Sequence, residues 1–289
     1  MTTAELNRHF GSSAVFFFDG PDGVPILRIV NEQAEAEIAL YGGQVMRFQP
    51  RGEAPVLWNG AEHEIQPDTA LRGGIPICFP WFAEHHCKAD RSVFPFHGFA
   101  RLSVWDVVLA DAFGAVVNLP PREGCPARVQ LRVQVAKTLS VALFVENTGA
   151  EPFRFEAALH PYFIISDIAS VSVEGLDGCA CLEKKVRQIQ QGAITFPAQV
   201  NRRYLDTTAA CTVRDPAAGR SIRVEKSGSR TTMIWNPGAD GITDDAVHFG
   251  PEEYRGFVCV EAACIGDDAA TLAPGQRHEL GVNISVTAP

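Results

Sequence analysis

The chain has 289 residues, of which 46% are hydrophobic and 20% are charged, and its formal net charge is −9 at pH 7. Such a composition is ordinary for a globular protein with ample material for a core. The negative charge argues against nucleic acid or an anionic membrane as a partner, because both favour a basic surface. No apolar run approaches the roughly 20 residues that span a bilayer, and no secretion signal is evident. We therefore expect a cytoplasmic protein that binds neither nucleic acid nor membrane.

The first part of the chain predicts a short helix followed by strands. Residues 3–10 fit a capped helix with Thr3 as N-cap. Apolar and acidic side chains alternate along 34–40, which indicates a strand with one buried face. After the break at Tyr41-Gly42-Gly43, the next pair of strands is indicated by Val45, Arg47, Val56 and Trp58.

The segment 72–105 has no periodicity and is rich in aromatic residues. Prolines at 76, 80 and 95 exclude a long helix or a central strand. The aromatic side chains need an apolar place to pack, which argues against disorder. We therefore expect a packed loop that forms one wall of a binding site and carries Arg72, His97 and Arg101. Lys88 and Arg91 are expected to be ordinary solvated charges.

Beyond this loop the chain alternates with period two. The alternation is clearest in 129–135 and is repeated in 139–145 and 153–159, with turn signals at 147–149 and 175–178. Further strands are expected at 210–214, 221–225, 231–235, 257–261 and 278–286. No helical pattern persists for about ten to twelve residues. These features predict an all-β protein, a large antiparallel β-sandwich forming one domain over residues 1–289, with 1–20 as an N-terminal extension.

The eight cysteines include no CxxC pair, and several lie inside apolar runs. We expect reduced, mostly buried thiols in a cytoplasmic protein. The run His85-His86-Cys87 is a poor metal motif because adjacent residues converge badly on one ion, so a solvated loop tip is the favoured interpretation. We expect no metal and no cofactor.

Two titratable residues stand where the strand pattern predicts core. His160 ends a strongly apolar strand before Pro161, and Glu261 follows four apolar residues. Taken singly, the histidine could be satisfied by a backbone carbonyl and the glutamate could lie in solvent at a strand end. Burial beside apolar runs shifts pKa values towards the neutral forms, and a histidine with a carboxylate is the usual acid–base pair.

Six segments in order carry a resemblance to a known family: RGGIP at 72–76, FPWF at 79–82, HGFAR at 97–101, ALHPYF at 158–163, IWNP at 234–237 and VCVEAA at 258–263. From about Gly42 to Pro274 the chain resembles the aldose 1-epimerase (galactose mutarotase) superfamily, and within it the D-hexose-6-phosphate mutarotases, or glucose-6-phosphate 1-epimerases. The resemblance implies a β-supersandwich with the site on an open concave face. It also implies His160 as general acid, Glu261 as general base, Arg72 and Arg101 on the phosphate, and His97 on the sugar.

Two positions depart from the family pattern. Phe96 stands where glutamine often precedes the His-Gly pair, so a hydrogen bond to the sugar is either missing or replaced by stacking. Asn201 stands where aspartate is usual, and Asp206 could substitute for it only in a different local register. We include Asn201 and Asp206 among the expected substrate-binding residues and leave the preferred sugar open.

The expected function is interconversion of α and β anomers of hexose 6-phosphates, with glucose 6-phosphate as first choice, by a monomer. Alternatives are a mutarotase of unphosphorylated aldoses and a non-catalytic sugar-phosphate-binding protein. A glycoside hydrolase or lyase would want a second catalytic carboxylate. For work near neutrality we expect an anionic partner to raise the pKa of His160.

Overall fold

The computed structural model describes residues 1–60, 69–85, 93–243 and 250–288, so His86, Cys87, Lys88 and Arg91 lie outside the described residues. In that part of the chain, no helix combines the length and the apolar character needed to cross a membrane. The helical segments are α1 (Thr3–Phe10) and the 3₁₀ turns η1 (Pro21–Gly23), η2 (Ala100–Leu102), η3 (Asp240–Thr243), η4 (Glu253–Gly256) and η5 (Gly266–Asp268).

Strands make up most of the regular structure. In chain order they are β1 (Val15–Asp19), β2 (Pro25–Val30), β3 (Ala34–Ala39), β4 (Gln44–Pro50), β5 (Ile77–Cys78), β6 (Asp106–Asp111), β7 (Gly114–Leu119), β8 (Ala127–Val135), β9 (Leu139–Asn147), β10 (Phe153–Phe155), β11 (Ala157–Leu159), β12 (Tyr162–Ile164), β13 (Ser172–Glu174), β14 (Ala180–Glu183), β15 (Val186–Ile189), β16 (Val200–Tyr204), β17 (Cys211–Asp215), β18 (Arg220–Ser227), β19 (Thr231–Asn236), β20 (Phe257–Cys264), β21 (Ala270–Leu272) and β22 (Arg277–Thr287).

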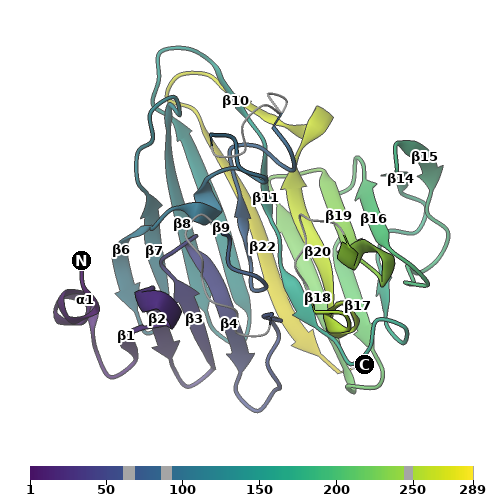
Figure 1. Cartoon of the computed structure of the whole chain (residues 1–289), viewed down its shortest axis with the longest axis horizontal. Coiled ribbons are helices and arrows are strands. Elements are labelled where there is room, and N and C mark those ends of the chain that lie inside the picture. Colours follow the sequence, from purple (N-terminus) through teal and green to yellow (C-terminus); the bar gives the residue numbers. More distant parts are fainter. Residues whose placement is uncertain (61–68, 86–92, 244–249, 289) are drawn as a thin grey trace.

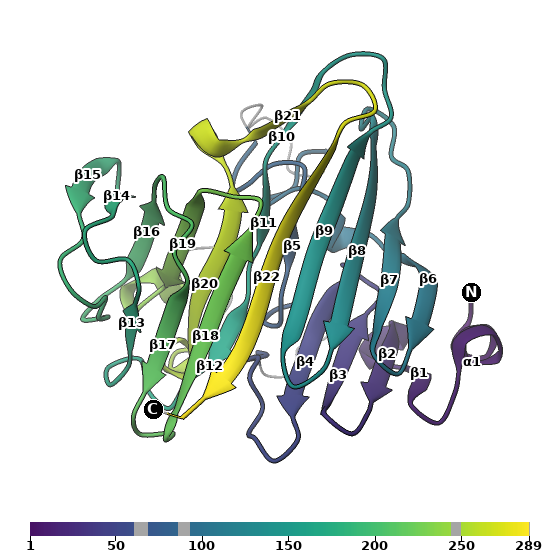
Figure 2. The same ribbon diagram turned by 180° about the vertical axis from the view of Figure 1, so that it is seen from behind.

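The strands form two layers (Figures 1 and 2). The back layer is one sheet with strand order β13-β17-β18-β22-β9-β8-β7-β6. The front layer consists of the sheet β1-β2-β3-β4 beside the sheet β15-β14-β16-β19-β20-β11-β5, and a bridge between Val45 and Ile75 connects them. The paired strands run antiparallel, so the predicted all-β sandwich is confirmed.

Alternating burial explains the core between the layers. In β8 and β9 every second residue is buried, and these side chains pack with those of β3 and β20 in one cluster. β20 differs, because all eight of its residues are buried. Successive side chains of a strand point to opposite faces. Val260 and Ala262 therefore face the core between the layers. Glu261 and Ala263 point to the opposite side of the front layer, where other residues of the chain bury them.

The predicted N-terminal helix is confirmed, but its cap is Thr2 and not Thr3. The helix itself begins at Thr3, so the capping position falls one residue earlier. The Thr2 hydroxyl accepts from the backbone N–H of Glu5, and the Glu5 carboxylate accepts from the N–H of Thr2. The Asn7 side chain then exchanges two hydrogen bonds with the backbone of Phe17, which fixes the helix to β1.

Two other strand predictions are corrected. The alternation over 153–159 is divided between β10, which pairs with β21, and β11, which pairs with β5 and β20. Glu156 lies at the division, where its backbone N–H donates to the carbonyl of Pro80. The stretch around Val56 and Trp58 forms no strand and contributes only a single bridge, between Leu57 and Phe163.

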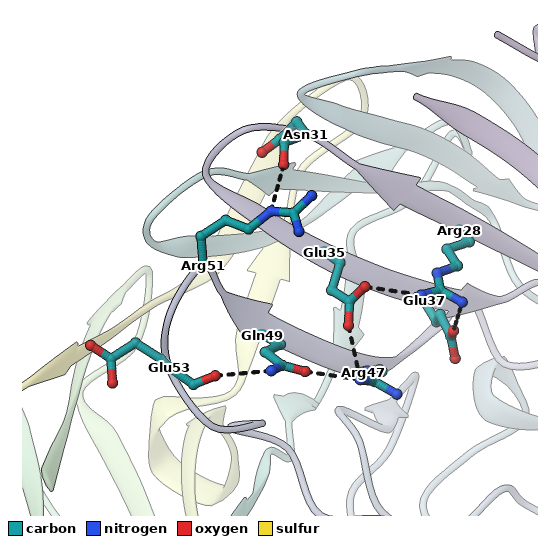
Figure 3. A network of polar contacts seen from close by, with 8 residues as sticks. All are labelled: Arg28, Asn31, Glu35, Glu37, Arg47, Gln49, Arg51 and Glu53. Atoms are coloured by element: carbon teal, nitrogen blue, oxygen red, sulfur yellow. Dashed lines mark hydrogen bonds and ion pairs between the residues drawn. The ribbon is translucent and has the colours of Figure 1, made fainter. Parts of the chain in front are cut away.

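The outer face of β2, β3 and β4 carries a network of charges (Figure 3). The carboxylate of Glu35 accepts from Arg28 at 2.9 Å and from Arg47 at 2.8 Å. Arg28 also lies 3.6 Å from Glu37. These side chains are between 18% and 41% exposed, so the network is partly solvated and each acid in it has a cationic partner.

Candidate active site

The outward face of β20 meets the end of β11 at a buried histidine and glutamate. His160 directly follows β11, and its backbone N–H donates to the carbonyl of Pro76 at 3.1 Å. The pairing of Leu159 with Ala262 places the next two residues, His160 and Glu261, opposite each other. His160 Nε2 lies 3.3 Å from Glu261 Oε1, and the two side chains are only 9% and 1% exposed.

Burial controls the protonation of this pair. It lowers the pKa of His160 to about 3, and the nearby Arg101 cation acts in the same direction. It raises the pKa of Glu261 well above the usual value. Both shifts favour the neutral forms, so a single proton shared by the pair is favoured on the carboxyl group. The expectation that the pKa of His160 is raised is wrong, because desolvation dominates and a cation lies nearby. Glu261 Oε2 is buried and has no hydrogen-bond partner among the described residues.

His97 is locked by the backbone of the 72–105 loop. Its φ of 63° is left-handed, and its N–H donates to the carbonyl of Ala83 at 2.9 Å. The N–H of Ala83 donates in return to His97 Nδ1 at 2.9 Å. Because burial lowers the pKa of His97 well below its usual value, the ring is neutral and carries its proton on Nε2. The ring centre lies 5.9 Å from that of His160, so Nε2–H is a fixed donor at the site.

Gly98, which follows His97, is required because the chain passes very close to the backbone of Phe79 at this point. Gly98 has a φ of +79°, and a Cβ there would lie 2.0 Å from the carbonyl oxygen of Phe79. This contact explains why the His-Gly pair occurs together in the loop.

Arg101 lies on the turn η2, near both His97 and His160. Its Nη2 donates to the carbonyl of Phe96 at 2.8 Å, and the guanidinium lies 6.0 Å from the centre of the Phe96 ring. Its Nε is buried without a hydrogen-bond partner in the described chain. The cation lowers the pKa of both His97 and His160. Phe96, the departure from the family pattern, thus helps to position this arginine.

Arg72 lies close enough to Tyr162 and Glu253 for both to act on its pKa. Gly73 allows the chain to turn here, since a Cβ on it would lie 2.2 Å from the carbonyl oxygen of Trp58. Burial lowers the pKa of Arg72, and the Glu253 carboxylate opposes that effect.

Aromatic side chains form a wall that sequence analysis did not identify as part of the site. Tyr162 stacks on His160 with ring centres 4.9 Å apart and on Trp58 at 5.9 Å. Trp235 meets His160 edge-on at 5.8 Å. Tyr162 lies in the ALHPYF segment with His160, and Trp235 lies in the separate IWNP segment, so membership of these two segments was the available signal.

The remaining predicted residues lie further away. Asn201 is exposed on β16 and pairs with Trp235 of β19, which pairs with Cys259 of β20, so it shares the outward face with Glu261 two strands away. Asp206 lies beyond β16 in an exposed ion pair with Arg230 at 3.1 Å. The structure thus brings His160, Glu261, His97 and Arg101 together.

The chemistry of this cluster is proton transfer next to positive charge. A proton donor and acceptor in contact can serve one reacting group, while the arginines favour an anion beside it. In the described part of the chain, no group of three or more His, Cys, Asp or Glu residues could hold a metal ion.

Comparison with known proteins gives consistent results. Residues 25–285 match the family model for aldose 1-epimerase. A protein of Cenchrus ciliaris named "putative glucose-6-phosphate 1-epimerase" is 33% identical over 84% of this chain and 78% of its own length. A protein of the same name from Escherichia coli (strain K12) is 30% identical over 84% of both chains. The crystal structure of a "putative mutarotase" from Salmonella typhimurium matches with a TM-score of 0.85 at 27% identity, covering 96% of this chain and 95% of that one.

Proposed function

Since this chain belongs to the aldose 1-epimerase family, we propose that it interconverts the α and β anomers of hexose 6-phosphates, with glucose 6-phosphate as first substrate. The names of the two relatives support this substrate class. The observation that carries the proposal is the buried contact of 3.3 Å between His160 Nε2 and Glu261 Oε1 beside the Arg101 cation. A pair that holds one proton suits a reaction that takes up and gives back one proton.

Anomer exchange requires the hemiacetal ring to open, the C1–C2 bond to rotate and the ring to close on the other face. Glu261 accepts the proton of the anomeric hydroxyl while protonated His160 donates to the ring oxygen, and the C1–O5 bond breaks. Closure reverses both transfers, so the pair ends with the proton that it began with. The starting state requires the shared proton to move from Glu261 to His160 across their contact as the substrate enters.

The cations are assigned to the phosphate. Arg101 and Arg72 would bind its oxygens, for which the planar guanidinium fork is well suited. Because the phosphate lies away from the reacting atoms, its binding energy orients the ring over His160 and Glu261. The fixed Nε2–H of His97 would donate to a sugar hydroxyl. A substrate contact of Asp206 stays a prediction.

We also propose that the protein works in the cytoplasm as a monomer. The cysteines of the described ranges are free thiols, as expected in a reducing compartment. Sedimentation analysis at working concentration tests the monomeric state.

Saturation-transfer NMR of anomer exchange tests the function. Exchange of glucose 6-phosphate above the buffer background, with a higher kcat/KM than for glucose, is expected. Equal kcat/KM for both sugars would indicate a mutarotase of unphosphorylated aldoses. Binding of glucose 6-phosphate without faster exchange would indicate a non-catalytic sugar-phosphate-binding protein.

A further inference from the structure

A cavity of about 210 Å³ lies on the outward face of the front layer, close to the acid–base pair. Pairing across the sheet runs from Glu261 to Met233 and then to Arg203. Paired residues point to the same face, and neighbouring strands lie about 4.8 Å apart, so Arg203 is about 10 Å from Glu261 along the sheet. Met233 lines the cavity and also packs with Ala158 and Ala263, so it forms the wall between the cavity and the pair.

The cavity carries positive charge. Lys184 and Arg203 line it, and the side chain of neither has a hydrogen bond or ion pair with any residue in the described ranges. The guanidinium of Arg203 lies over Gly266, since a Cβ there would be 2.5 Å from its Nη1. The side chains of Gln199 and Asn201 add neutral polar groups to the lining.

The acids near these cations are engaged elsewhere. Glu183 also lines the cavity, but its carboxylate accepts from Arg202 Nε at 3.0 Å. Glu156 accepts from the backbone N–H groups of Phe82 and Gly266. The cavity therefore suits a neutral polar or negatively charged group and disfavours a cation.

The direction of the sugar follows from the proposed function, on which this inference rests. The ring oxygen lies at His160 and the anomeric oxygen at Glu261. C5 and the 6-phosphate then lie on the side of Arg101, and C2 lies on the opposite side, towards Met233. The cavity is the next space beyond Met233.

We propose that this cavity receives the substituent at C2 of the sugar and admits a bulky neutral or anionic group there while selecting against an ammonium group. A 2-acetamido group has four heavy atoms. At roughly 30 Å³ each, as for liquid water, they need about 120 Å³. Its carbonyl oxygen can accept from Arg203, and its methyl group can pack on Met233.

The direct test compares three sugars by saturation-transfer NMR: glucose 6-phosphate, its 2-acetamido-2-deoxy analogue and its 2-amino-2-deoxy analogue. The pH is kept low enough for the amine to be charged. We expect kcat/KM for the acetamido sugar within about tenfold of glucose 6-phosphate. The amino sugar should be at least about tenfold slower than the acetamido sugar because of repulsion by the two cations.

Charge-reversal variants test the role of the cavity separately from that of the acid–base pair. Lys184→Glu and Arg203→Glu should each shift the ratio of kcat/KM towards the amino sugar by about tenfold. Lys185→Glu is the matched control, because Lys185 occupies the same turn with a similar left-handed φ (67° against 47°) but does not line the cavity. Its ratio should stay at the wild-type value. If Arg203→Glu fails to fold, Arg203→Gln with the exposed Lys184→Glu tests the same point.

The outcomes separate this inference from the proposed function. Exchange of glucose 6-phosphate without exchange of the acetamido sugar overturns the C2 assignment and leaves the proposed function standing. An unchanged ratio in folded Lys184→Glu and Arg203 variants also overturns it. Failure to exchange any of the three sugars overturns the proposed function itself.

Discussion

The front layer carries ionised or ionisable groups on its outer face in two regions, and their environments are opposite. On β2–β4, burial tends to raise the pKa of Glu35, but Arg28 and Arg47 outweigh it and the pKa is lowered (Figure 3). On β20, burial raises the pKa of Glu261, and its partner is the neutral ring of His160.

The difference separates a structural network from the pair that we propose to be reactive. Around Glu35 each charge has a fixed partner and access to water, so the charges destabilise the folded state very little. At Glu261 burial is not offset by a fixed cation in contact with it, and the carboxyl group is held neutral. An arrangement that leaves a buried acid uncompensated is typical of a functional site. The uncompensated region is therefore where substitutions should affect activity most.

The largest expected effect is on turnover. His160→Asn and Glu261→Gln should each lower kcat/KM for anomer exchange at least about a hundredfold, because each removes a proton-transfer group while roughly keeping its shape. Glu35→Gln, the same chemical change in the compensated region, should keep wild-type exchange. Saturation-transfer NMR with thermal unfolding measures both properties. Wild-type exchange in a folded His160 or Glu261 variant would refute that residue's role.

The next effect concerns the phosphate. Arg101→Ala and Arg72→Ala should each remove about 1.5–3 kcal/mol of charge-assisted binding. This corresponds to a loss of about 10- to 150-fold in the preference for glucose 6-phosphate over glucose. Arg47→Ala removes an arginine from the compensated region and should not change that preference. Equal losses on both sugars for Arg101→Ala would assign this arginine a structural role.

The two regions also show what sequence alone can predict. Strands with one buried face, such as β8 and β9, are predictable because the alternation of apolar and polar residues shows which face is buried. β15 is not, because all its residues are exposed and no apolar periodicity marks it. The sequence pattern predicts Glu156 as an ordinary position of one long strand, because its contacts with Phe82 and Gly266 come from distant segments.

The contact between His160 and Glu261 could be anticipated from the sequence, but the electrostatics of the pair could not. His160 and Glu261 were conspicuous as polar residues at apolar strands. The direction of the pKa of His160 depends on depth of burial and on Arg101, which is far away in sequence, so no local pattern reveals it. The same holds for the aromatic wall of Trp58 and Tyr162, which exists only after folding.

Stability against pH should differ in sign between the two regions. The raised pKa of Glu261 means that its contribution is present below the unfolded value, near 4.5, and is lost as pH rises through the folded value. The lowered pKa of Glu35 means that its contribution is present above 4.5 and is lost as pH falls.

Glu261→Gln should therefore gain stability relative to wild type as pH rises from about 4 to 8. Glu35→Gln should lose up to about 1 kcal/mol at neutral pH and less in acid. Urea unfolding at several pH values measures both. A fall in the relative stability of Glu261→Gln with rising pH would contradict the raised pKa of Glu261.

The smallest effect is a shift in the acid limb of the pH profile. In the proposed mechanism the pair works with one proton, so kcat/KM should fall in acid when a second proton reaches His160. Burial and the Arg101 cation both lower the pKa of His160, so this limb should lie well below the usual titration range of histidine. Arg101→Gln removes the cation and leaves the burial, which is the larger cause. The limb should therefore move to higher pH, by a small amount, and remain below 6.5.

The sugar phosphate itself titrates near pH 6, and spontaneous mutarotation is acid–base catalysed. The measurement should therefore use glucose, which carries no titrating phosphate, subtract the buffer background and plot the ratio of variant to wild type. Arg47→Gln should give a flat ratio, because that arginine acts on Glu35 and not on the pair. A flat ratio for Arg101→Gln as well would show that Arg101 does not control the protonation of His160. A limb that moved to lower pH would show that Arg101 does not act on His160 as a nearby cation, and the contrast between the two regions would then rest on burial alone.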